Sequence, residues 1–363
     1  MLAPLDRRTL LTYAALAPFA RGRRAGEEWR PARDEPDLTE PDLTEARILR
    51  NIAGLRPHRQ AGIRVEAERL GDKFVVHNYG HGGAGVTLSW GSAEEAVTLL
   101  AATVAAPADV AVLGAGAVGL ASARVLQERG YRVRVLAEDF PPNTTSDVAG
   151  AEWLPIGVSR GDDDDARQRF ERIVRTSWQR FRALLGDEYG VYERPHFEVG
   201  NSERLLADVP GDVIPAARAL PKLPFARIKR RGERFDTLLV EPPIYLTQMM
   251  RQVLRGGGKL QARTFASASD VTSLAESAIV NCLGLGAGRV FGDDSVRAVR
   301  GQLVHAFPQQ LPYLLSHEGG TLLPRRDCIV LGGTYEMGID DPTPDARMCA
   351  EIVAGHRRFF GGI

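Results

Sequence analysis

The sequence predicts an α/β fold with a parallel, helix-covered sheet and a second part built on a mixed or antiparallel sheet. Between residues 110 and 136, two short apolar runs of strand type flank a helical stretch, which is the order of a strand–helix–strand unit. Residues 191–245 instead mix short strands with prolines, as expected for an antiparallel sheet. The chain has 363 residues, which is enough for two domains.

The strand–helix–strand unit contains a glycine-rich turn. Val110–Leu113 is the first strand, Gly114–Gly119 is the turn, and Arg132–Leu136 is the second strand, with Glu138 directly after it. In this pattern the glycines permit a tight bend, a close approach to a pyrophosphate, and close packing of helix on strand. The amides at the start of the helix bind the phosphates, and the acidic residue after the second strand accepts hydrogen bonds from the ribose hydroxyls. The unit therefore predicts a dinucleotide-binding fold; the alternative is a glycine-rich turn in another strand–helix–strand unit.

Composition excludes several classes of partner. Lysine plus arginine equals aspartate plus glutamate, 46 each, so no overall field favours nucleic acid or an anionic membrane. No apolar run is long enough to cross a bilayer. Cys282, Cys328 and Cys349 lack metal-ligand spacing, so we expect buried free thiols and no metal site. A small-molecule substrate is the expected partner, and a homodimer is one expectation for the assembly.

Residues 1–34 are expected to form a leader. The pair Arg7–Arg8 precedes a short apolar segment that ends near Ala20, a pattern similar to a twin-arginine export signal. No clear small-residue cleavage site precedes the basic stretch Arg21–Arg24. Export is favoured over the alternative, a cytoplasmic protein with a disordered basic arm or a misplaced start codon.

Residues 35–50 are expected to be a linker with the start of a helix. The pentapeptide Glu-Pro-Asp-Leu-Thr occurs twice, at 35–39 and 40–44, and its prolines prevent a continuous helix. The polar composition predicts a tether without a core of its own. A helix is expected to begin near Leu43, with Thr44 as its cap.

A second glycine-rich stretch lies at His77–Thr87, after a short strand at Phe74–Val76 and before a helix expected at Thr87–Ala102. Its glycine density indicates that backbone must approach another group closely. The helix N-terminus that follows is a second site for an anion or a partial negative charge.

Further elements are expected along the rest of the chain. A long helix over Ala166–Leu185 has apolar and aromatic residues at helical spacing, so those residues are expected in a core. The acidic run Asp162–Asp165 before it is expected to be a solvated turn. The remaining predicted elements are strands at Ala278–Asn281, Gln302–Ala306 and Cys328–Gly332 and a last helix at Asp345–Phe360.

Several sequence blocks together resemble the D-amino-acid oxidase family of flavoproteins. The blocks are Leu113–Gly119, Thr144–Ala151, Val280–Gly284, Arg300–Gln302, Leu331–Gly333, Gly54–Arg59 and His77–Gly83. They spread over about residues 45–350. The combination of the last two blocks is highly specific for this family.

The order of these blocks differs from that of the family. There, the blocks at Gly54–Arg59 and His77–Gly83 close the chain, whereas here they open it. The resemblance therefore implies a circular permutant of the D-amino-acid oxidase fold, with the old ends joined through Ala101–Ala108. Permutation is tolerated at exposed loops and adds only a modest loop-closure cost. The alternative, a chimera or a frame error, is less favoured because no block is missing or duplicated.

This interpretation assigns the domains. Residues 1–34 are the leader, 35–50 the linker and helix start, 51–107 the permuted C-terminal part, 108–160 and 275–300 a Rossmann-like FAD-binding domain, and 161–274 and 301–363 the substrate domain and closing elements.

The resemblance implies FAD, rather than NAD, as the cofactor. The residues it assigns to FAD are Gly114, Ala115, Gly116, Val118, Gly119, Glu138 and Asp139 at the pyrophosphate and adenosine, Thr144, Thr145 and Ser146 at phosphate or flavin, Gly150 and Ala151 along the isoalloxazine, and Gly82, Gly83, Gly85, Val86 and Thr87 at its N1–C2 carbonyl. A positive helix end at that carbonyl stabilises the charge of reduced flavin.

The resemblance also implies an activity in D-amino-acid metabolism. Arg56 suits two-point capture of an α-carboxylate, and Tyr79 and Gly83 complete the implied catalytic set. The reaction that the resemblance implies transfers a hydride from Cα to flavin N5, after which the imino acid would hydrolyse to a 2-oxo acid and ammonia and oxygen would be reduced to hydrogen peroxide. Arg59 is expected to form a structural ion pair. The alternatives are a glycine or imino-acid oxidase, an amino-acid dehydrogenase, and a non-catalytic flavin-binding protein.

Some positions depart from the family. Lys229–Arg234 is basic where the family places lid tyrosines, and it is expected to be either a solvated loop or a selector of acidic side chains, as in the D-aspartate oxidase branch. Glu152 lies beside the expected flavin, so its carboxylate is expected to turn away or be protonated. Ala84 replaces the usual aromatic residue. The identity of the D-amino acid stays open.

Overall fold

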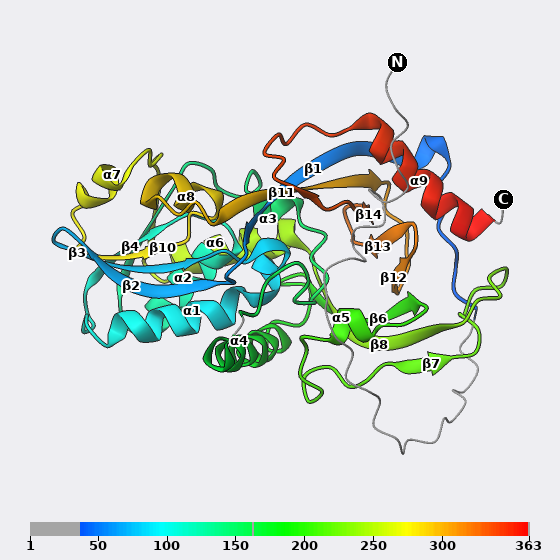
Figure 1. Ribbon diagram of the computed structural model, residues 1–363, viewed down its shortest axis with the longest axis horizontal. Coiled ribbons are helices and arrows are strands. Elements are labelled where there is room, and N and C mark those ends of the chain that lie inside the picture. The colour runs from blue at the N-terminus through cyan, green and yellow to red at the C-terminus, as the bar shows by residue number, and fades with distance from the viewer. Residues whose placement is uncertain (1–36, 162, 362–363) are drawn as a thin grey trace.

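The computed structural model describes residues 37–161 and 163–361 (Figure 1). Within this part of the chain, the strands form a six-stranded sheet and a nine-stranded sheet, which lie side by side along the long axis of the molecule. No helix in this part is long and apolar enough to cross a membrane. The predicted leader lies outside the described residues.

The six-stranded sheet is the dinucleotide-type half. Its strands, in spatial order, are β2 (Arg64–Leu70), β3 (Lys73–Tyr79), β10 (Ala278–Asn281), β4 (Asp109–Leu113), β5 (Arg132–Ala137) and β9 (Lys259–Ala262). All neighbouring pairs are parallel except β2 with β3. The expected strands at 110–113, 132–136 and 278–281 are confirmed to within one residue at each end.

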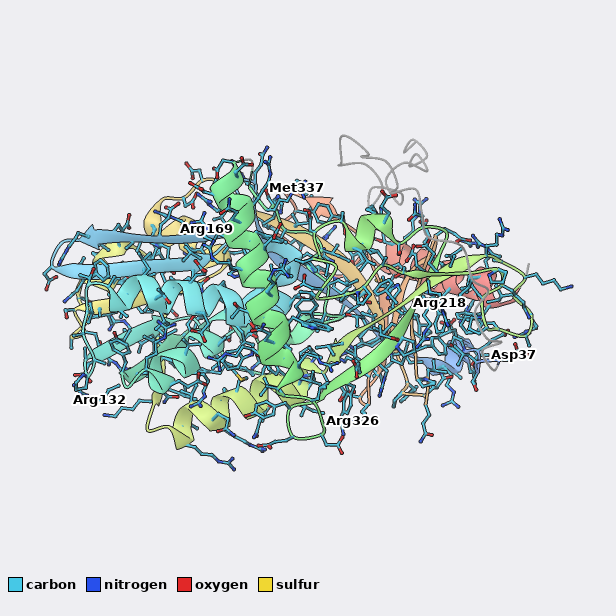
Figure 2. The ribbon with its side chains drawn as sticks, turned by 90° about the horizontal axis from the view of Figure 1, so that it is seen from below. Asp37, Arg132, Arg169, Arg218, Arg326 and Met337 are labelled. Atoms are coloured by element: carbon cyan, nitrogen blue, oxygen red, sulfur yellow. The ribbon has the colours of Figure 1, made fainter. Side chains whose placement is uncertain are left out.

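Both faces of this sheet are covered, which explains its continuous apolar strands. Val110 and Val112 of β4 join the core on one face, while Ala111 and Leu113 join the core on the other. The helices of this half are α1 (Gly85–Ala101), α2 (Ala117–Glu128), α3 (Thr145–Val148), α4 (Asp164–Arg182), α6 (Pro242–Arg255), α7 (Ala268–Thr272) and α8 (Leu285–Phe291). Seen from below in Figure 2, α4 with Arg169 crosses the outer side of α1.

The nine-stranded sheet is largely antiparallel. Its strands are β1 (Ile48–Arg59), β11 (Val296–Ala306), β14 (Ile329–Gly332), β13 (Gly320–Pro324), β12 (Leu314–His317), β6 (Val191–Val199), β8 (Gly232–Val240) and β7 (Arg218–Leu220), with β15 (Glu336–Met337) beside β11. Helix α9 (Ala346–Gly361) packs on this sheet through an apolar core, and α5 (Glu203–Leu206) follows β6. This is the mixed sheet that the sequence predicts.

The N-terminal segment contributes to both sheets. β1 pairs with β11 over its whole length, with Arg56 opposite Val299, although the two strands are far apart in the sequence (Figure 1). β2 and β3 then cross to the other sheet, where β3 pairs with β10. The segment before β4 therefore completes the two halves and spans the region where they meet.

The expected tether and helix around Leu43 are wrong for the described residues. Glu45–Arg47 forms a single 3₁₀ turn, and the chain then continues as β1. Leu43 is buried in the core beneath α9, and its carbonyl accepts a hydrogen bond from Arg357 (2.7 Å). The open edge of β11 offers strand pairing, and this tertiary contact overrides the local signal for a helix.

Two further expectations need revision. Asp163 accepts a hydrogen bond from the amide of Ala166 (2.7 Å) and caps α4, so Asp163–Asp165 are exposed, as expected, but begin a helix instead of forming a turn. The segment 161–274 is shared between the sheets, because β9 pairs with β5 of the dinucleotide-type half. The three cysteines are free, with Cys328 and Cys349 buried and Cys282 partly so.

Candidate active site

A cavity of about 1270 Å³ lies where the two sheets meet. Its wall is formed by residues of β1, β3, β5, β6, β11, β12, β13 and β14, by the turn after β4 and by the N-terminal turns of α1 and α2. Every residue that the sequence assigned to catalysis or to FAD lies on this wall. Blocks that are far apart in the chain are thus brought together at one site.

The turn after β4 forms one wall of the cavity. A Cβ at Gly114, which has a φ of +101°, would lie 2.4 Å from the carbonyl oxygen of Cys282. A Cβ at Gly119 would lie 2.0 Å from the carbonyl oxygen of Gly114, so helix α2 and β4 can approach only through glycine. Ala115, Gly116 and Val118 complete this wall.

Polar groups surround this turn. The hydroxyl of Ser146 accepts a hydrogen bond from the amide of Ala117 (3.0 Å) at the start of α2. Thr144 caps α3 and donates its hydroxyl to Asp147 (2.7 Å), with Thr145 next to it on the wall. Glu138 and Asp139 follow β5, and the exposed carboxylate of Glu138 has no protein partner within residues 37–161 and 163–361. An acceptor of this kind suits ribose hydroxyls.

The second glycine-rich stretch brings the start of α1 to the cavity. Gly82 has a φ of +54°, and a Cβ there would lie 2.0 Å from the carbonyl oxygen of Gly157. The amide of Gly83 donates to that same carbonyl (3.0 Å). Gly85, Val86 and Thr87 form the first turn of α1 on the cavity wall, and its amides make this wall electropositive.

The cavity wall also carries Gly150 and Ala151, which the sequence assigned to the isoalloxazine. Ala151 has a φ of +59°, a conformation rare for residues with a Cβ. Its carbonyl accepts a hydrogen bond from the amide of Val240 (2.9 Å), which ties this segment to the end of β8. The wall is thus held in place by the nine-stranded sheet.

Arg56 projects from β1 onto the cavity wall. A Cβ at Gly301 of β11 would lie 2.3 Å from Nη2 of Arg56, so the guanidinium lies flat against that glycine. Nη1 donates to the carbonyl oxygen of Thr334 (3.2 Å). Arg56 forms no ion pair with a carboxylate in the described part of the chain. A guanidinium presented in this way can bind the carboxylate of a ligand at two points.

Arg59 behaves differently, as the sequence predicted. Its Nε lies 3.2 Å from Oδ2 of Asp293, and both side chains are largely buried. Asp293 also accepts a hydrogen bond from the hydroxyl of Tyr79 (2.7 Å), and that hydroxyl accepts one from Arg64 (2.7 Å). Burial raises the pKa of Tyr79 to about 12. Although Tyr79 lines the cavity, these contacts engage its hydroxyl and give it a structural role instead of the catalytic one expected from the sequence.

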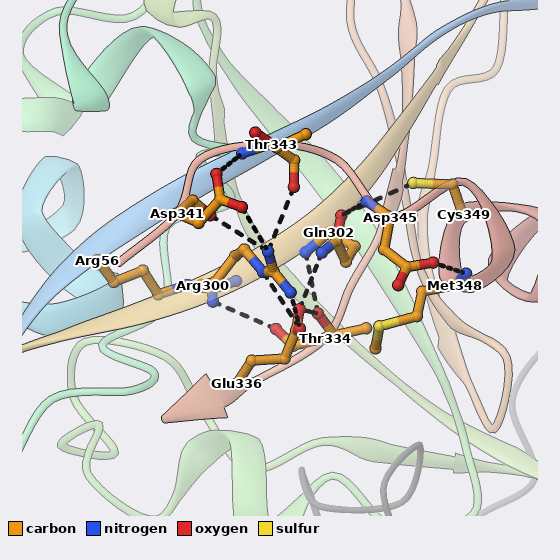
Figure 3. Close-up of polar contacts among 10 residues, drawn as sticks. All are labelled: Arg56, Arg300, Gln302, Thr334, Glu336, Asp341, Thr343, Asp345, Met348 and Cys349. Carbon is orange, nitrogen blue, oxygen red and sulfur yellow. Dashed lines mark hydrogen bonds and ion pairs between the residues drawn. The ribbon is translucent and has the colours of Figure 1, made fainter. Parts of the chain in front are cut away.

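A hydrogen-bonded network holds Thr334, whose carbonyl oxygen accepts from Arg56, in place (Figure 3). The hydroxyl of Thr334 accepts from the amide of Gln302 (2.9 Å) and donates to Glu336 (2.7 Å). Glu336 also accepts from the side chain of Gln302 (3.1 Å) and pairs with Arg300 (2.7 Å). Gln302 and Thr334 are buried. The network fixes the backbone carbonyl against which Arg56 is oriented.

A cluster that the sequence did not reveal lies on another wall. Glu152 meets Nδ1 of His196 at 2.5 Å, and Glu198 lies 3.5 Å from Nε2 of the same ring. Burial opposes the charged imidazole, but the two carboxylates outweigh it and raise the pKa of His196 to about 9. Glu152 was noted from the sequence, but not its partners. The available signal was the spacing of His196 and Glu198, which places both on one face of β6.

The basic stretch Lys229–Arg234 does not line the cavity. Arg230 forms an ion pair with Glu318 (2.5 Å), and Arg234 pairs with Asp236 (2.8 Å). Residues 229–231 are exposed, in agreement with the expected solvated loop, whereas Gly232 and Arg234 belong to β8. These contacts give no support to the expectation that this stretch selects acidic side chains.

The cavity fits FAD. Two helix N-termini reach it, from α1 and α2, and amides at such ends bind phosphate and stabilise negative charge. Gly114 and Gly119 form a cradle that a Cβ would fill, and Glu138, which has no partner among the described residues, supplies an acceptor beside it. A family model described as FAD dependent oxidoreductase, the DAO model, matches residues 109–363.

The chain belongs to this family. Among its relatives, it is 31% identical over 264 residues to a D-amino-acid oxidase of Streptomyces coelicolor, covering 68% of this chain and 75% of that one. It is 30% identical over 253 residues to a D-amino-acid oxidase of Rubrobacter xylanophilus (67% and 74%) and 27% identical over 257 residues to human D-aspartate oxidase (68% and 74%). The protein is therefore an oxidoreductase with FAD as its cofactor.

Solved structures support the fold. The glycine oxidase of Geobacillus kaustophilus matches with a TM-score of 0.51 and 16% identity, covering 70% of this chain and 78% of that one. The iminodiacetate oxidase of Chelativorans sp. BNC1 matches with a TM-score of 0.52 and 18% identity (70% and 79%). The family match begins at Asp109, the first residue of β4, so β1, β2, β3 and α1 lie outside it.

Proposed function

We propose that this protein oxidises D-amino acids to 2-oxo acids and ammonia and passes the electrons to oxygen, forming hydrogen peroxide. The observation that carries this proposal is Arg56, a guanidinium without a carboxylate partner in the described part of the chain, on the wall of a cavity that fits FAD. The names of the relatives from Streptomyces coelicolor and Rubrobacter xylanophilus support the same substrate class.

The residues of this chain bind and orient the substrate. Arg56 holds the α-carboxylate at two points, and Gly301 and Thr334 keep the guanidinium in one orientation. The N-terminus of α1 supplies positive potential at the cavity wall, where it stabilises charge that develops during oxidation. When bound, FAD supplies the hydride-accepting chemistry. No side-chain base is needed if the α-amine is neutral.

An assay with both enantiomers tests the proposal. Oxygen consumption, peroxide and 2-oxo acid are measured with the FAD-loaded protein and a panel of D- and L-amino acids. We expect consumption of oxygen with D-enantiomers only, with one peroxide formed for each 2-oxo acid. Turnover of L-enantiomers alone, or none with any D-amino acid, contradicts the proposal. Reduction of the flavin without peroxide would instead identify a dehydrogenase.

A preference for acidic D-amino acids is not part of this proposal. The sequence feature that suggested it, Lys229–Arg234, does not line the cavity. The carboxylates of Glu152 and Glu198 lie on that wall, and they would repel an acidic side chain bound nearby.

A further inference from the structure

The cluster at Glu152, His196 and Glu198 is not used by the proposed reaction. His196 is fully buried and stacks on the ring of Phe235, with 4.6 Å between ring centroids. Each nitrogen of its ring faces one carboxylate, of Glu152 on one side and Glu198 on the other. Both carboxylate residues line the cavity, whereas the imidazole lies behind them. The cluster thus presents acceptor oxygens to the cavity on a rigid support.

The cluster has acceptor capacity to spare. The ring of His196 contacts Oε1 of Glu152 and Oε2 of Glu198, so it leaves the other oxygen of each carboxylate unused. Two carboxylates face one imidazolium. Arg204 also lines the cavity and adds a second positive charge that acts on Glu198. An ionised carboxylate only accepts hydrogen bonds, so the groups that complete it are donors.

A second observation points to a ligand at the same place. Ser316 is the register partner of Glu198 on the adjacent parallel strand β12, and it lines the cavity. The residue is 7% exposed, and its hydroxyl has no hydrogen-bond partner in the described part of the chain. A buried hydroxyl without a partner is unfavourable, so such a group commonly marks a site that a ligand or water completes.

We propose that Glu152, Glu198 and Ser316, supported by His196, form a subsite for a substrate side chain that ends in an N–H donor, either an ammonium or an amide. This inference rests on the proposed function, because Arg56 holds the carboxylate of the same molecule. Two acceptor carboxylates bind a terminal donor, repel an acidic side chain and lose their solvation beside an aliphatic one.

A binding experiment without turnover tests the subsite. The FAD-loaded protein is titrated with ω-amino carboxylates of three to six carbons and with the unsubstituted carboxylates of the same length. The flavin spectrum and the fluorescence of the protein, in which Trp153 adjoins Glu152, report binding. We expect at least one ω-amino carboxylate to bind ten-fold more tightly than its unsubstituted counterpart. Equal affinity across the series overturns the inference.

Variants assign the effect to the cluster. In Glu198→Gln, the ten-fold preference is expected to shrink to three-fold or less, and Ser316→Ala should weaken it without removing a charge. Glu193→Gln is the matched control, since Glu193 lies on the same strand, is exposed and pairs with Arg182 away from the cavity. A preference that survives both Glu198→Gln and Ser316→Ala overturns the inference.

Turnover separates this inference from the proposed function. The ratio of kcat/KM is compared for D-lysine, D-glutamine, D-norleucine and D-glutamate. We expect kcat/KM for D-lysine or D-glutamine to exceed kcat/KM for D-norleucine by about ten-fold. A higher value for D-lysine indicates a site for an ammonium, and a higher value for D-glutamine indicates a site for an amide. If D-norleucine or D-glutamate is the best substrate, the subsite is wrong while the proposed function stands. If no D-amino acid reduces the flavin, the proposed function itself fails.

Discussion

Arg56 and Arg59 project from the same strand, yet only Arg59 is neutralised by a protein carboxylate in the described residues. A planar fork that binds a carboxylate at two points cannot be replaced by a lysine of equal charge. We therefore predict that Arg56→Lys lowers kcat/KM for D-amino acids about 100-fold, or roughly 3 kcal/mol, with FAD content unchanged. Steady-state kinetics measures this effect.

Arg59→Lys is the matched control for that variant. It keeps a cation beside Asp293, so we expect kcat/KM within a few-fold of the wild-type value. Wild-type kcat/KM in Arg56→Lys would contradict the role given to Arg56.

The buried His196 makes stability depend on pH. Its pKa is raised from 6.5 to about 9, so the stabilisation is fully present below pH 6.5 and is lost as the pH rises through 9. The loss is on the order of 3 kcal/mol. Urea unfolding at pH 6, 8 and 10 should show a decline in the free energy of unfolding that is much smaller in His196→Gln. The same pH dependence in both proteins would show that His196 is not charged in the folded state.

At the level of single residues, the sequence predicted the site where local spacing carries the information. Gly114, Gly119 and Arg56 belong to short motifs, and the structure places each of them on the cavity wall. His196 and Ser316 belong to no motif, because their relation to Glu152 depends on strand pairing between distant segments. Tyr79 was assigned a role in catalysis because it lies within a motif, but its contacts with Asp293 and Arg64 could not be read from the sequence.

At the level of elements, close packing of α1 on α4 depends on one glycine. A Cβ at Gly91 would lie 2.1 Å from the carbonyl oxygen of Ile173, and the amide of Gly91 donates to Ser177 (2.8 Å). Alanine in a helix interior is normally better than glycine by about 1 kcal/mol. Here we predict that Gly91→Ala destabilises the fold by about 1–3 kcal/mol, because the helices must separate.

Urea denaturation of the FAD-loaded protein measures this prediction. Gly211→Ala is the control, because no atom lies within 4 Å of a Cβ at that glycine, and it should change the free energy of unfolding little. A stabilised Gly91→Ala variant would mean that helix propensity outweighs the contact between α1 and α4.

Elements with a strong local pattern were predictable, and elements made by pairing were not. β4, α2 and β5 follow from apolar runs, glycines and helix length alone. The segment before β1 looks like a tether in the sequence, yet Leu43 is buried and β1 pairs with β11. β9 joins the dinucleotide-type sheet only because β5 leaves an edge beside it, which no local signal in 259–262 reveals.

For the whole molecule, we propose that the order of the blocks is a circular permutation of the family's order. The described end of α9 lies against the first described segment, since Arg357 donates to the carbonyl of Leu43 (2.7 Å) and pairs with Glu45 (3.2 Å). The segment 102–108, which joins α1 to β4, is mostly exposed. Nearby ends and an exposed connection are the conditions under which a chain can be reordered.

A reordered chain tests this proposal. It begins at residue 108, runs to 361, continues through a short glycine-serine linker into residue 37, and ends at 107. We expect it to fold, to bind FAD and to show an apparent Tm within a few degrees of that of a chain spanning 37–361. Soluble protein that does not bind FAD, or an insoluble product from several linker lengths, would contradict the proposal.

The central claim is that Arg56 of the N-terminal segment presents D-amino acids to FAD in the cavity between the two sheets. The most direct measurement is the visible spectrum of the FAD-loaded protein under anaerobic conditions, with D- and L-enantiomers of the same amino acid added in turn. The account predicts bleaching of the flavin by the D-enantiomer and much slower bleaching in Arg56→Lys. A flavin that stays oxidised with every D-amino acid, or bleaches equally fast in Arg56→Lys, would contradict it.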